Sequence, residues 1–357
     1  MDLEKIVKLE QSIEHLKNKT SRIYFLVQDT KGNPRAGVKY AYDMALTLLD
    51  NGFNSIIIHE TKDYQGVESW LDDRYKKIPH QPIEGENLAI SPEDFVVIPE
   101  LYGHVMDQLK SFPCGKIVLC QSYDYMLETL PPGVTWQQYG FMKCITTSEE
   151  QKKYISEIMK SLSIDVVSPF ISECFTKKEK PAKPIISIHT REPRDTAKII
   201  KTFYLKFPQF RWITFRDMRG IKQEDFSNFL KDSYLSIWVD SESSFGTFPL
   251  ESMKCGTPVI GKVPNMKPSW MNESNGVWTY EFNEIIDVVA NFTQNWLEDN
   301  IKEELYQKMQ DSVNQYTEKS KFDNSVLSLF NEYFQARQNS FSNQLEKIKV
   351  TEEEENN

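Results

Sequence analysis

Short apolar runs alternate with helical stretches along the first half of this chain. The runs lie at residues 22–27, 56–58, 95–98, 117–120, 144–146 and 165–167. Between the first two runs, the apolar residues from Val38 to Leu48 recur at the spacing of an amphipathic helix. Strands that are each followed by a helix form parallel sheets with helices on both faces. The alternation therefore predicts a doubly wound α/β domain.

The same alternation begins again after a charged, proline-bearing stretch at residues 175–184. Its apolar runs lie at residues 185–188, 212–215, 235–239, 259–260 and 277–280. A chain of 357 residues exceeds the size at which one hydrophobic core usually stops growing, so two such domains in tandem are expected. The predicted order is an N-terminal helix (1–18), a first Rossmann-like domain (19–176), a linker (177–184), a second Rossmann-like domain (185–325), a terminal helix (326–342) and a disordered acidic tail (343–357).

Composition argues against several classes of protein. Lys and Arg number 42 against 52 Asp and Glu, a net charge of −10, so a nucleic-acid partner is not favoured. No apolar run is long enough to cross a membrane, and the opening residues do not resemble a signal peptide. The 5 cysteines form no CxxC pair, and no metal-binding motif is present. We therefore expect a cytoplasmic protein that holds no metal ion and no cofactor.

The segment from Asp240 to Gly261 carries the clearest chemical signal. A polar loop that contains Gly246 follows a predicted strand, and a helix with Pro249 in its first turn follows the loop. Ligands of open α/β sheets bind at the carboxyl ends of the strands, where this helix is expected to begin. Its free backbone N–H groups suit a diphosphate, and Glu251 can accept hydrogen bonds from the hydroxyls of a ribose. Alternatively, the loop is an ordinary turn and Glu251 complements the helix dipole.

This segment resembles the Gly-x-x-Pro-Leu-Glu-(Ala/Ser)-Met-x-(Ala/Cys)-Gly-x-Pro-Val motif of the retaining GT-B glycosyltransferases, the family related to glycogen and sucrose synthases. The resemblance implies two Rossmann-like domains that face each other across a cleft, with C-terminal helices. It implies a nucleotide sugar as the donor, linked to UDP or GDP. It also assigns Glu251 to the ribose, and the backbone around Phe248 to Leu250 to the diphosphate.

One position departs from the family pattern. The family usually has a second glutamate, in contact with the donor sugar, where this chain has Ser243, and Glu242 is the nearest acid. A shifted loop and an altered donor preference both remain open. The residues to which the resemblance assigns donor contacts are Gly37, Arg194, Glu242, Ser244, Phe245, Gly246, Thr247, Phe248, Pro249, Leu250 and Glu251.

Two candidate catalytic cations follow the run at 185–188. Arg191 and Lys198 resemble the family's strand-end arginine and the lysine after it, which hold the departing diphosphate and stabilise its charge. Their spacing differs from that of the family, so Arg194 can replace either of them. Alternatively, these residues form the solvated basic start of a helix.

Loops at the strand ends of the first domain are expected to form the acceptor side of the cleft. The loop at 29–38, which includes Gly37, resembles the family's glycine-rich loop beside the donor phosphate and the acceptor. The dinucleotide fingerprint Gly-x-Gly-x-x-Gly is absent, which argues against NAD. The candidate acceptor-side residues are Glu100, Tyr102, His104, Gln121 and Tyr123, and each of them can alternatively be a solvated loop residue.

The resulting prediction is a glycosyltransferase that moves a sugar from a nucleotide donor to an acceptor hydroxyl, with retention and without a metal ion. A glycan or a glycolipid is the favoured acceptor. Two other hypotheses stay open: a sugar-nucleotide epimerase of the same fold, and a non-catalytic relative that binds a nucleotide or a glycan.

Overall fold

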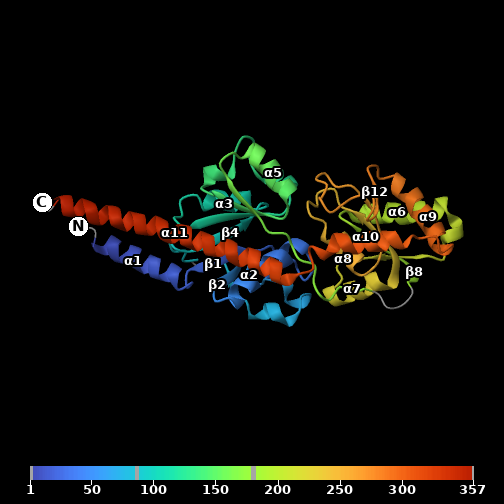
Figure 1. Ribbon diagram of the computed structural model, residues 1–357, viewed down its shortest axis with the longest axis horizontal. Coiled ribbons are helices and arrows are strands. Elements are labelled where there is room, and N and C mark those ends of the chain that lie inside the picture. The colour runs from blue at the N-terminus through green and yellow to red at the C-terminus, as the bar shows by residue number, and fades with distance from the viewer. Residues whose placement is uncertain (1–2, 85–87, 178–181, 356–357) are drawn as a thin grey trace.

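Two parallel sheets form the framework of the computed structural model, which describes residues 3–84, 88–177 and 182–355 (Figure 1). The first sheet has 7 strands in the order β3-β2-β1-β4-β5-β6-β7. They are β1 (Arg22–Leu26), β2 (Asn54–His59), β3 (His80–Pro82), β4 (Phe95–Pro99), β5 (Gly115–Cys120), β6 (Lys143–Thr146) and β7 (Ser163–Val166). The second sheet has 5 strands in the order β12-β11-β10-β8-β9. They are β8 (Lys183–Thr190), β9 (Thr214–Asp217), β10 (Ser233–Val239), β11 (Val259–Lys262) and β12 (Val277–Thr279).

Helices connect these strands and cover the sheets. The α-helices are α1 (Leu3–Lys17), α2 (Ala36–Asp50), α3 (Gly103–Gln108), α4 (Tyr123–Thr129), α5 (Glu149–Ile158), α6 (Pro193–Lys206), α7 (Gln223–Asp232), α8 (Thr247–Lys254), α9 (Glu284–Leu297), α10 (Glu303–Asn314) and α11 (Lys319–Glu355). Short 3-10 helices lie at Val67–Ser69, Asp73–Lys77, Trp136–Tyr139 and Pro208–Phe210. The predicted α/β class with two doubly wound sheets is confirmed.

Successive side chains of the central strands enter different cores. In β1, Phe25 packs in a core with α2 and α11, whereas its neighbour Tyr24 packs in a separate core on the other face of the sheet. The second sheet behaves in the same way, with Ile237 and Trp238 of β10 in two different cores. A strand that is buried on both faces is apolar along its whole length. This is why the central strands were recognisable as continuous apolar runs.

Strand β3 was not predicted. It is a three-residue edge strand, His80-Gln81-Pro82, that pairs in parallel with β2 through Ile57 and His80. All of its residues are half-buried, so it has no apolar run to reveal it. Pro82 fits there because an edge strand leaves one row of N–H groups without a partner in the sheet.

The last helix returns from the second domain to the first. α11 lies alongside α1 and α2, and the start of α1 lies beside the end of α11 in an arm that these two helices form (Figure 1). Phe334 of α11 stacks on Phe95 with 4.9 Å between ring centroids and meets Phe53 edge-on at 5.1 Å. The core of the first domain therefore includes residues from both ends of the chain.

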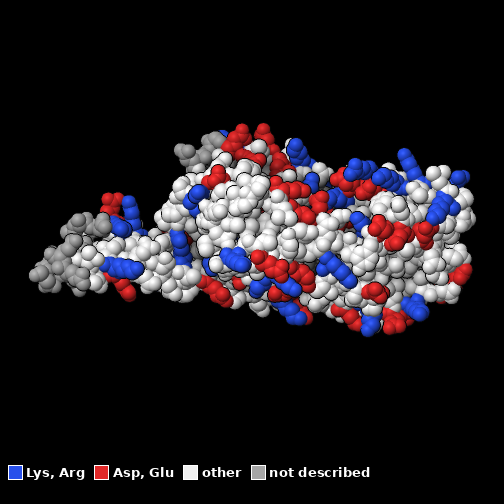
Figure 2. Space-filling view, turned by 90° about the horizontal axis from the view of Figure 1, so that it is seen from above, with Lys and Arg blue, Asp and Glu red and all other residues white. Residues whose placement is uncertain are grey.

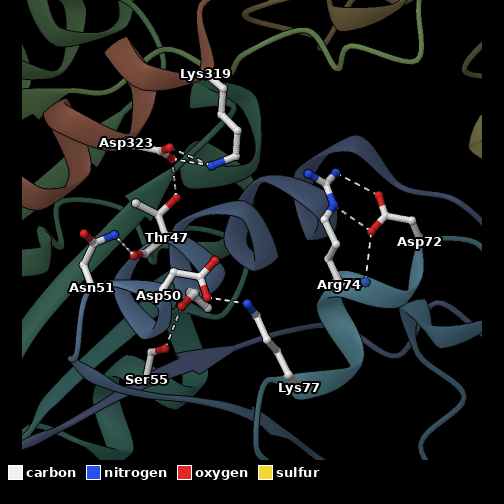
Figure 3. A network of polar contacts seen from close by, with 10 residues as sticks. Thr47, Asp50, Asn51, Ser55, Asp72, Arg74, Lys77, Lys319 and Asp323 are labelled. Carbon is white, nitrogen blue, oxygen red and sulfur yellow. Dashed lines mark hydrogen bonds and ion pairs between the residues drawn. The ribbon is translucent and has the colours of Figure 1, made fainter.

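A polar network fixes the start of α11 against α2 (Figure 3). Asp323 accepts a hydrogen bond from the Thr47 hydroxyl at 2.7 Å and forms an ion pair with Lys319 at 2.7 Å. Close to it, Asp50 at the end of α2 pairs with Lys77. The contacts of Asp323 thus hold the start of α11 against α2.

The end of the chain differs from the prediction. α11 begins before and ends after the predicted helix at 326–342, and residues 343–355, expected to be disordered, continue it. Phe341, Leu345 and Ile348 keep helical spacing and pack with the residues of the first core, which the acidic composition of the tail concealed. Of the predicted linker at 177–184, residues 178–181 lie outside the described residues, and β8 already begins at Lys183. Within the described ranges, none of the helices combines the length and the apolar character that crossing a membrane requires.

If α11 belongs to the first core, shortening Phe334 will destabilise the protein. We expect Phe334→Ala to lower the free energy of unfolding by about 3–5 kcal/mol, because it removes a buried ring and leaves a cavity. Asn331→Ala, at an exposed position of the same helix, is the control and should change it by less than about 0.5 kcal/mol. Chemical denaturation followed by circular dichroism measures both variants. Equal effects of the two substitutions would contradict the packing described above.

Candidate active site

A cavity of about 740 Å³ lies between the two domains at the carboxyl ends of their strands. Val27 and Glu100 line it where β1 and β4 end, and Arg191 and Asp240 line it where β8 and β10 end. The strand order reverses at both places. In the first sheet β1 is followed by β2 on one side, whereas β4 is followed by β5 on the other side. In the second sheet β8 is followed by β9 on one side and β10 by β11 on the other. Such a reversal leaves a crevice that suits a ligand.

Helix α8 begins at the wall of this cleft. Its N-cap is Gly246, which has a φ of 75°, and no side chain caps the helix. A side chain at Gly246 would need a strained backbone, and its Cβ would lie 3.0 Å from Trp270 and 3.1 Å from Trp238. The Ser243 hydroxyl accepts the N–H of Gly246 at 3.1 Å, while no side chain among the described residues caps the first turn of α8, whose N–H groups lack partners within the helix.

Most of the predicted donor residues line the cleft. They are Gly37, Glu242, Ser244, Phe245, Gly246, Thr247, Phe248 and Glu251. Pro249 and Leu250 do not line it, because their side chains are buried on the side of α8 that faces the domain. The helix begins at Thr247, slightly earlier than predicted, so Glu251 lies in its second turn.

Arg191 lies at the centre of the cleft wall, directly after β8. Its Nε lies 2.7 Å from Asp240 Oδ1 and 3.1 Å from Glu242 Oε2, and its Nη1 donates to the hydroxyl of Tyr125 in the first domain. The pairing of β8 with β10 explains the contact with Asp240, because Thr190 and Val239 are partners in the sheet and the next residue of each strand follows at the same edge. Arg191 is therefore held by groups from both domains.

Lys198 and Arg194 do not line the cleft, contrary to the prediction for a second cation there. Both are exposed on α6, and Lys198 lies 3.9 Å from Asp195. The buried face of this helix carries Thr196, Ile199 and Phe203, so positions 194 and 198 point toward solvent.

Four cations line the cleft within the described part of the chain: Arg35, Lys39, Arg191 and Arg219. Lys39, Arg35 and Arg219 were not among the residues predicted from the sequence. Lys39, whose side chain is 15% exposed, pairs with Asp43 at 2.7 Å and lies 4.9 Å from the Phe170 ring centre. Lys39 lies in the first turn of α2, directly after the predicted glycine-rich loop. This position is the sequence signal from which Lys39 could have been predicted.

Glu251 is half-buried and faces the cleft without a hydrogen-bond partner among the described residues. Burial raises the pKa of Glu251 to about 7, although the charges of Lys39 and Lys254 act against this rise. A carboxylate held in this state gains from a ligand that donates hydrogen bonds to it. Vicinal hydroxyls of a ribose are such donors.

Three further polar residues of the second domain line the cleft: Glu242, Ser244 and His189. Glu242 turns its carboxylate to Arg191, and its carbonyl accepts from the Ser122 hydroxyl at 2.8 Å. The hydroxyl of Ser244 is buried and has no partner among the described residues. His189 stacks on Phe248 at 5.0 Å, its Nδ1 also lacks a partner there, and burial lowers its pKa. Ser244 and His189 thus offer polar atoms at the cleft wall that have no partner among the described residues.

On the opposite wall, Gly37 and Gln121 lie in close contact. A Cβ at Gly37 would come within 2.6 Å of Gln121 Oε1, so a larger residue there would require the end of the Gln121 side chain to move. Glu100 is 1% exposed, and its Oε1 accepts the Ser122 N–H at 2.8 Å, while its Oε2 has no partner among the described residues. Burial raises the pKa of Glu100 to about 7, and the neighbouring backbone N–H groups oppose this shift.

The structure brings Glu100, Tyr102 and Gln121 to the cleft but places His104 and Tyr123 away from it. His104 is exposed on α3. Tyr123 packs against Tyr154 at 4.9 Å, and Tyr125, two positions further along α4, faces the cleft instead. Residues two apart on a helix point to nearly opposite sides, so the prediction selected the wrong tyrosine.

On the face seen in Figure 2, acidic and basic side chains are intermixed over both domains, and no continuous basic patch that would suit a polyanion is visible. This agrees with the net charge of −10. The cations described above lie in the cleft, where they can act on a small anionic ligand.

Two doubly wound domains that face each other across a cleft at the carboxyl ends of their strands define the GT-B fold. The structure of sucrose-phosphate synthase from Thermosynechococcus elongatus has a TM-score of 0.64 at 12% identity, covering 88% of this chain and 100% of that one. HepE of Anabaena in complex with UDP-glucose has a TM-score of 0.62 at 12% identity, covering 87% and 99%. The GT-B fold predicted from the motif is confirmed.

The comparison of sequences gives a more limited likeness. No protein-family model matches the chain. It is similar to an α-1,6-glucosyltransferase of Actinobacillus pleuropneumoniae serotype 7 (strain AP76), with 23% identity over 184 residues. This match covers 50% of the chain and 56% of the relative, so the chain spans about half the length of the curated relative that it matches.

The raised pKa of Glu251 leads to a prediction about stability. Between pH 4.5 and about 7 the folded protein holds a proton on Glu251 that the unfolded chain releases, so this residue makes the fold less stable as the pH rises. We expect Glu251→Gln to raise the free energy of unfolding at pH 8 by roughly 1–3 kcal/mol and to change it little at pH 4.5. Denaturant unfolding at the two pH values measures this difference. Glu281→Gln, at an exposed position, is the control, and a gain that is equal at both pH values would contradict the prediction.

Proposed function

We propose that the protein is a glycosyltransferase that uses a nucleotide-sugar donor and an acceptor hydroxyl. The observation that carries the proposal is the convergence of the free N-terminus of α8, Arg191 and Glu251 on one wall of the interdomain cleft. A helix N-terminus and an arginine suit a diphosphate, and the carboxylate suits the hydroxyls of a ribose. A nucleoside diphosphate combines both groups.

The donor is proposed to lie along the second domain. Its diphosphate would occupy the space in front of Gly246, Thr247 and Phe248, within reach of Arg191. Lys39 from the first domain is the proposed second cation, in place of Lys198, because it lines the same cleft and its charge acts on Glu251. HepE was solved with UDP-glucose, which makes this compound the first donor to test. A GDP-linked sugar is the next.

The proposed reaction forms a bond between the acceptor oxygen and the anomeric carbon of the sugar, and it breaks the bond from that carbon to the β-phosphate oxygen. The electron pair of the broken bond stays on the phosphate, where Arg191 and the N–H groups of α8 stabilise the charge. We propose retention of configuration, in which the departing phosphate takes the acceptor proton on the same face. Protein cations would then carry the phosphate charge without a metal ion.

Recognition of the sugar would differ from the usual family pattern. Ser243 uses its hydroxyl to hold Gly246, and Glu242 uses its carboxylate to hold Arg191. The hydroxyl of Ser244 and the imidazole of His189 remain available at the wall, and both lack a partner among the described residues. We propose that these two groups contact the donor in place of the second glutamate.

The acceptor is proposed to bind against the first domain, at Tyr102, Gln121 and the carboxyl group of Glu100. A glycan or glycolipid hydroxyl fits this polar wall, and the named activity of the relative from Actinobacillus is in keeping with a sugar acceptor. The free thiols of Cys114, Cys120, Cys144, Cys174 and Cys255 support the proposal that the protein works in the cytoplasm.

A donor-turnover assay tests the proposed function. The purified protein is incubated with a panel of UDP- and GDP-sugars, with and without simple glycosides as acceptors, and the products are separated by chromatography. We expect release of the nucleoside diphosphate from one donor and a faster release with a suitable acceptor. An isomerised donor would instead indicate an epimerase, and binding without turnover would indicate a non-catalytic relative.

Replacing Arg191 tests the assignment of the diphosphate site. We expect Arg191→Ala to lower kcat/KM for the donor by about 10²–10³-fold, the loss found when one preorganised donor to a developing charge is removed. Arg191→Lys should recover part of the activity because it restores the charge without the planar geometry. Lys201→Ala, at an exposed position of α6, is the control for charge, and similar losses in both alanine variants would contradict the assignment.

A further inference from the structure

The start of α4 contacts the second domain at consecutive points along the mouth of the cleft. Ser122 donates to the carbonyl of Glu242 at 2.8 Å, and Asn265 lies 3.4 Å from the carboxylate of Asp124. Tyr125 reaches Arg191. A short segment of the first domain therefore touches the loop after β10 and the loop after β8, both of which line the proposed diphosphate site.

The hydrogen bonds of Arg191 are divided between the two domains. Its Nε faces Asp240 and Glu242 within the second domain, and its Nη1 donates to the hydroxyl of Tyr125 in the first. A guanidinium has five N–H groups in a fixed plane, so contacts at two of its nitrogens fix its orientation. Within the described part of the chain, Nη2 makes no hydrogen bond, which leaves its N–H groups for an anion in the cleft.

The partners of Arg191 differ in what they contribute. Asp240 and Glu242 belong to the same domain as Arg191, so their contacts with Arg191 do not cross the cleft. Tyr125 belongs to the other domain, and its ring centre lies 5.4 Å from the guanidinium carbon. Its hydroxyl can reach Arg191 only when the two cleft walls are as close as in this structure.

We propose that Tyr125 is a positioning residue that orients Arg191 toward the diphosphate when the domains are closed. The proposal rests on the proposed function, because it needs a diphosphate at this wall. The hydroxyl of Tyr125 accepts a hydrogen bond from Nη1 of Arg191, and this contact directs Nη2 of Arg191 toward the space in front of α8. When the domains separate, Arg191 loses this partner and its phosphate-binding geometry is no longer fixed. Closure of the cleft and preparation of the diphosphate site are thus one event.

The test compares a ligand that has phosphates with one that lacks them. Isothermal titration calorimetry measures the binding of UDP and of uridine, or of GDP and guanosine if GDP binds more tightly, to the wild type and to Tyr125→Phe. The phenylalanine keeps the ring and removes only the hydroxyl. We expect UDP affinity to fall about tenfold, as for the loss of one hydrogen bond to a charged group, and uridine affinity to stay unchanged.

Two further variants complete the experiment. In an Arg191→Lys background, Tyr125→Phe should cause no additional loss of UDP affinity, because the two residues act through one contact. Tyr154→Phe, which removes a hydroxyl on α5 outside the cleft, should leave both affinities unchanged.

Each outcome has a separate meaning. Unchanged UDP binding in Tyr125→Phe would overturn the role of Tyr125 while leaving the proposed function intact. An equal loss for UDP and uridine would also overturn it, because it would indicate a general effect on the cleft. If the wild type binds neither UDP nor GDP, the proposed function fails, and the role of Tyr125 fails with it.

Discussion

The reversal of strand order in each sheet is the constraint from which the rest of the cleft follows. Strands on either side of the reversal send their connections to opposite faces, so no helix covers the carboxyl ends between them. In the second sheet this places the residues after β8 and β10 side by side, and Arg191 meets Asp240 there. In the first sheet it opens the space between the loop before α2 and Glu100. Two such openings face each other, and the cleft results.

The electrostatics of the cleft are those of a site built for a ligand. Glu100 and Glu251 both have a pKa raised to about 7 by burial, and Ser244 and His189 keep buried polar atoms without protein partners in the described structure. Burial of such groups destabilises the fold unless something hydrogen-bonds to them. Arg191 and Lys39 instead have carboxylate partners, so their charges are partly balanced before any anion arrives. The cleft thus combines two cations that are paired with carboxylates, Arg191 and Lys39, with polar groups that have no partner among the described residues.

The sequence predicted the framework well because the central strands are buried on both faces and therefore apolar throughout. The motif from Ser244 to Val259 also located the helix N-terminus and Glu251 correctly in the cleft. Lys198 lies outside the cleft because it is on the exposed face of α6, and Tyr123 lies outside it because its ring packs against Tyr154. Lys39, which also lines the cleft, was not among the predicted residues, although it lies in the first turn of the helix after the predicted glycine-rich loop. The end of α11 was predicted to be disordered because its last residues are acidic, although Phe341, Leu345 and Ile348 continue the spacing of an apolar helix face.

The return of α11 to the first domain has a consequence for synthesis of the chain. Phe322, Phe330 and Phe334 complete the core beneath Phe25 and Phe95, yet they are translated after the entire second domain. On the ribosome, the first sheet therefore emerges with one apolar face covered only in part, by α1 and α2, until α11 appears. The usual order in which N-terminal domains finish folding first is reversed here. The nascent chain should consequently depend on chaperones that shield this face, and messages truncated before residue 319 should yield aggregating protein rather than an isolated first domain.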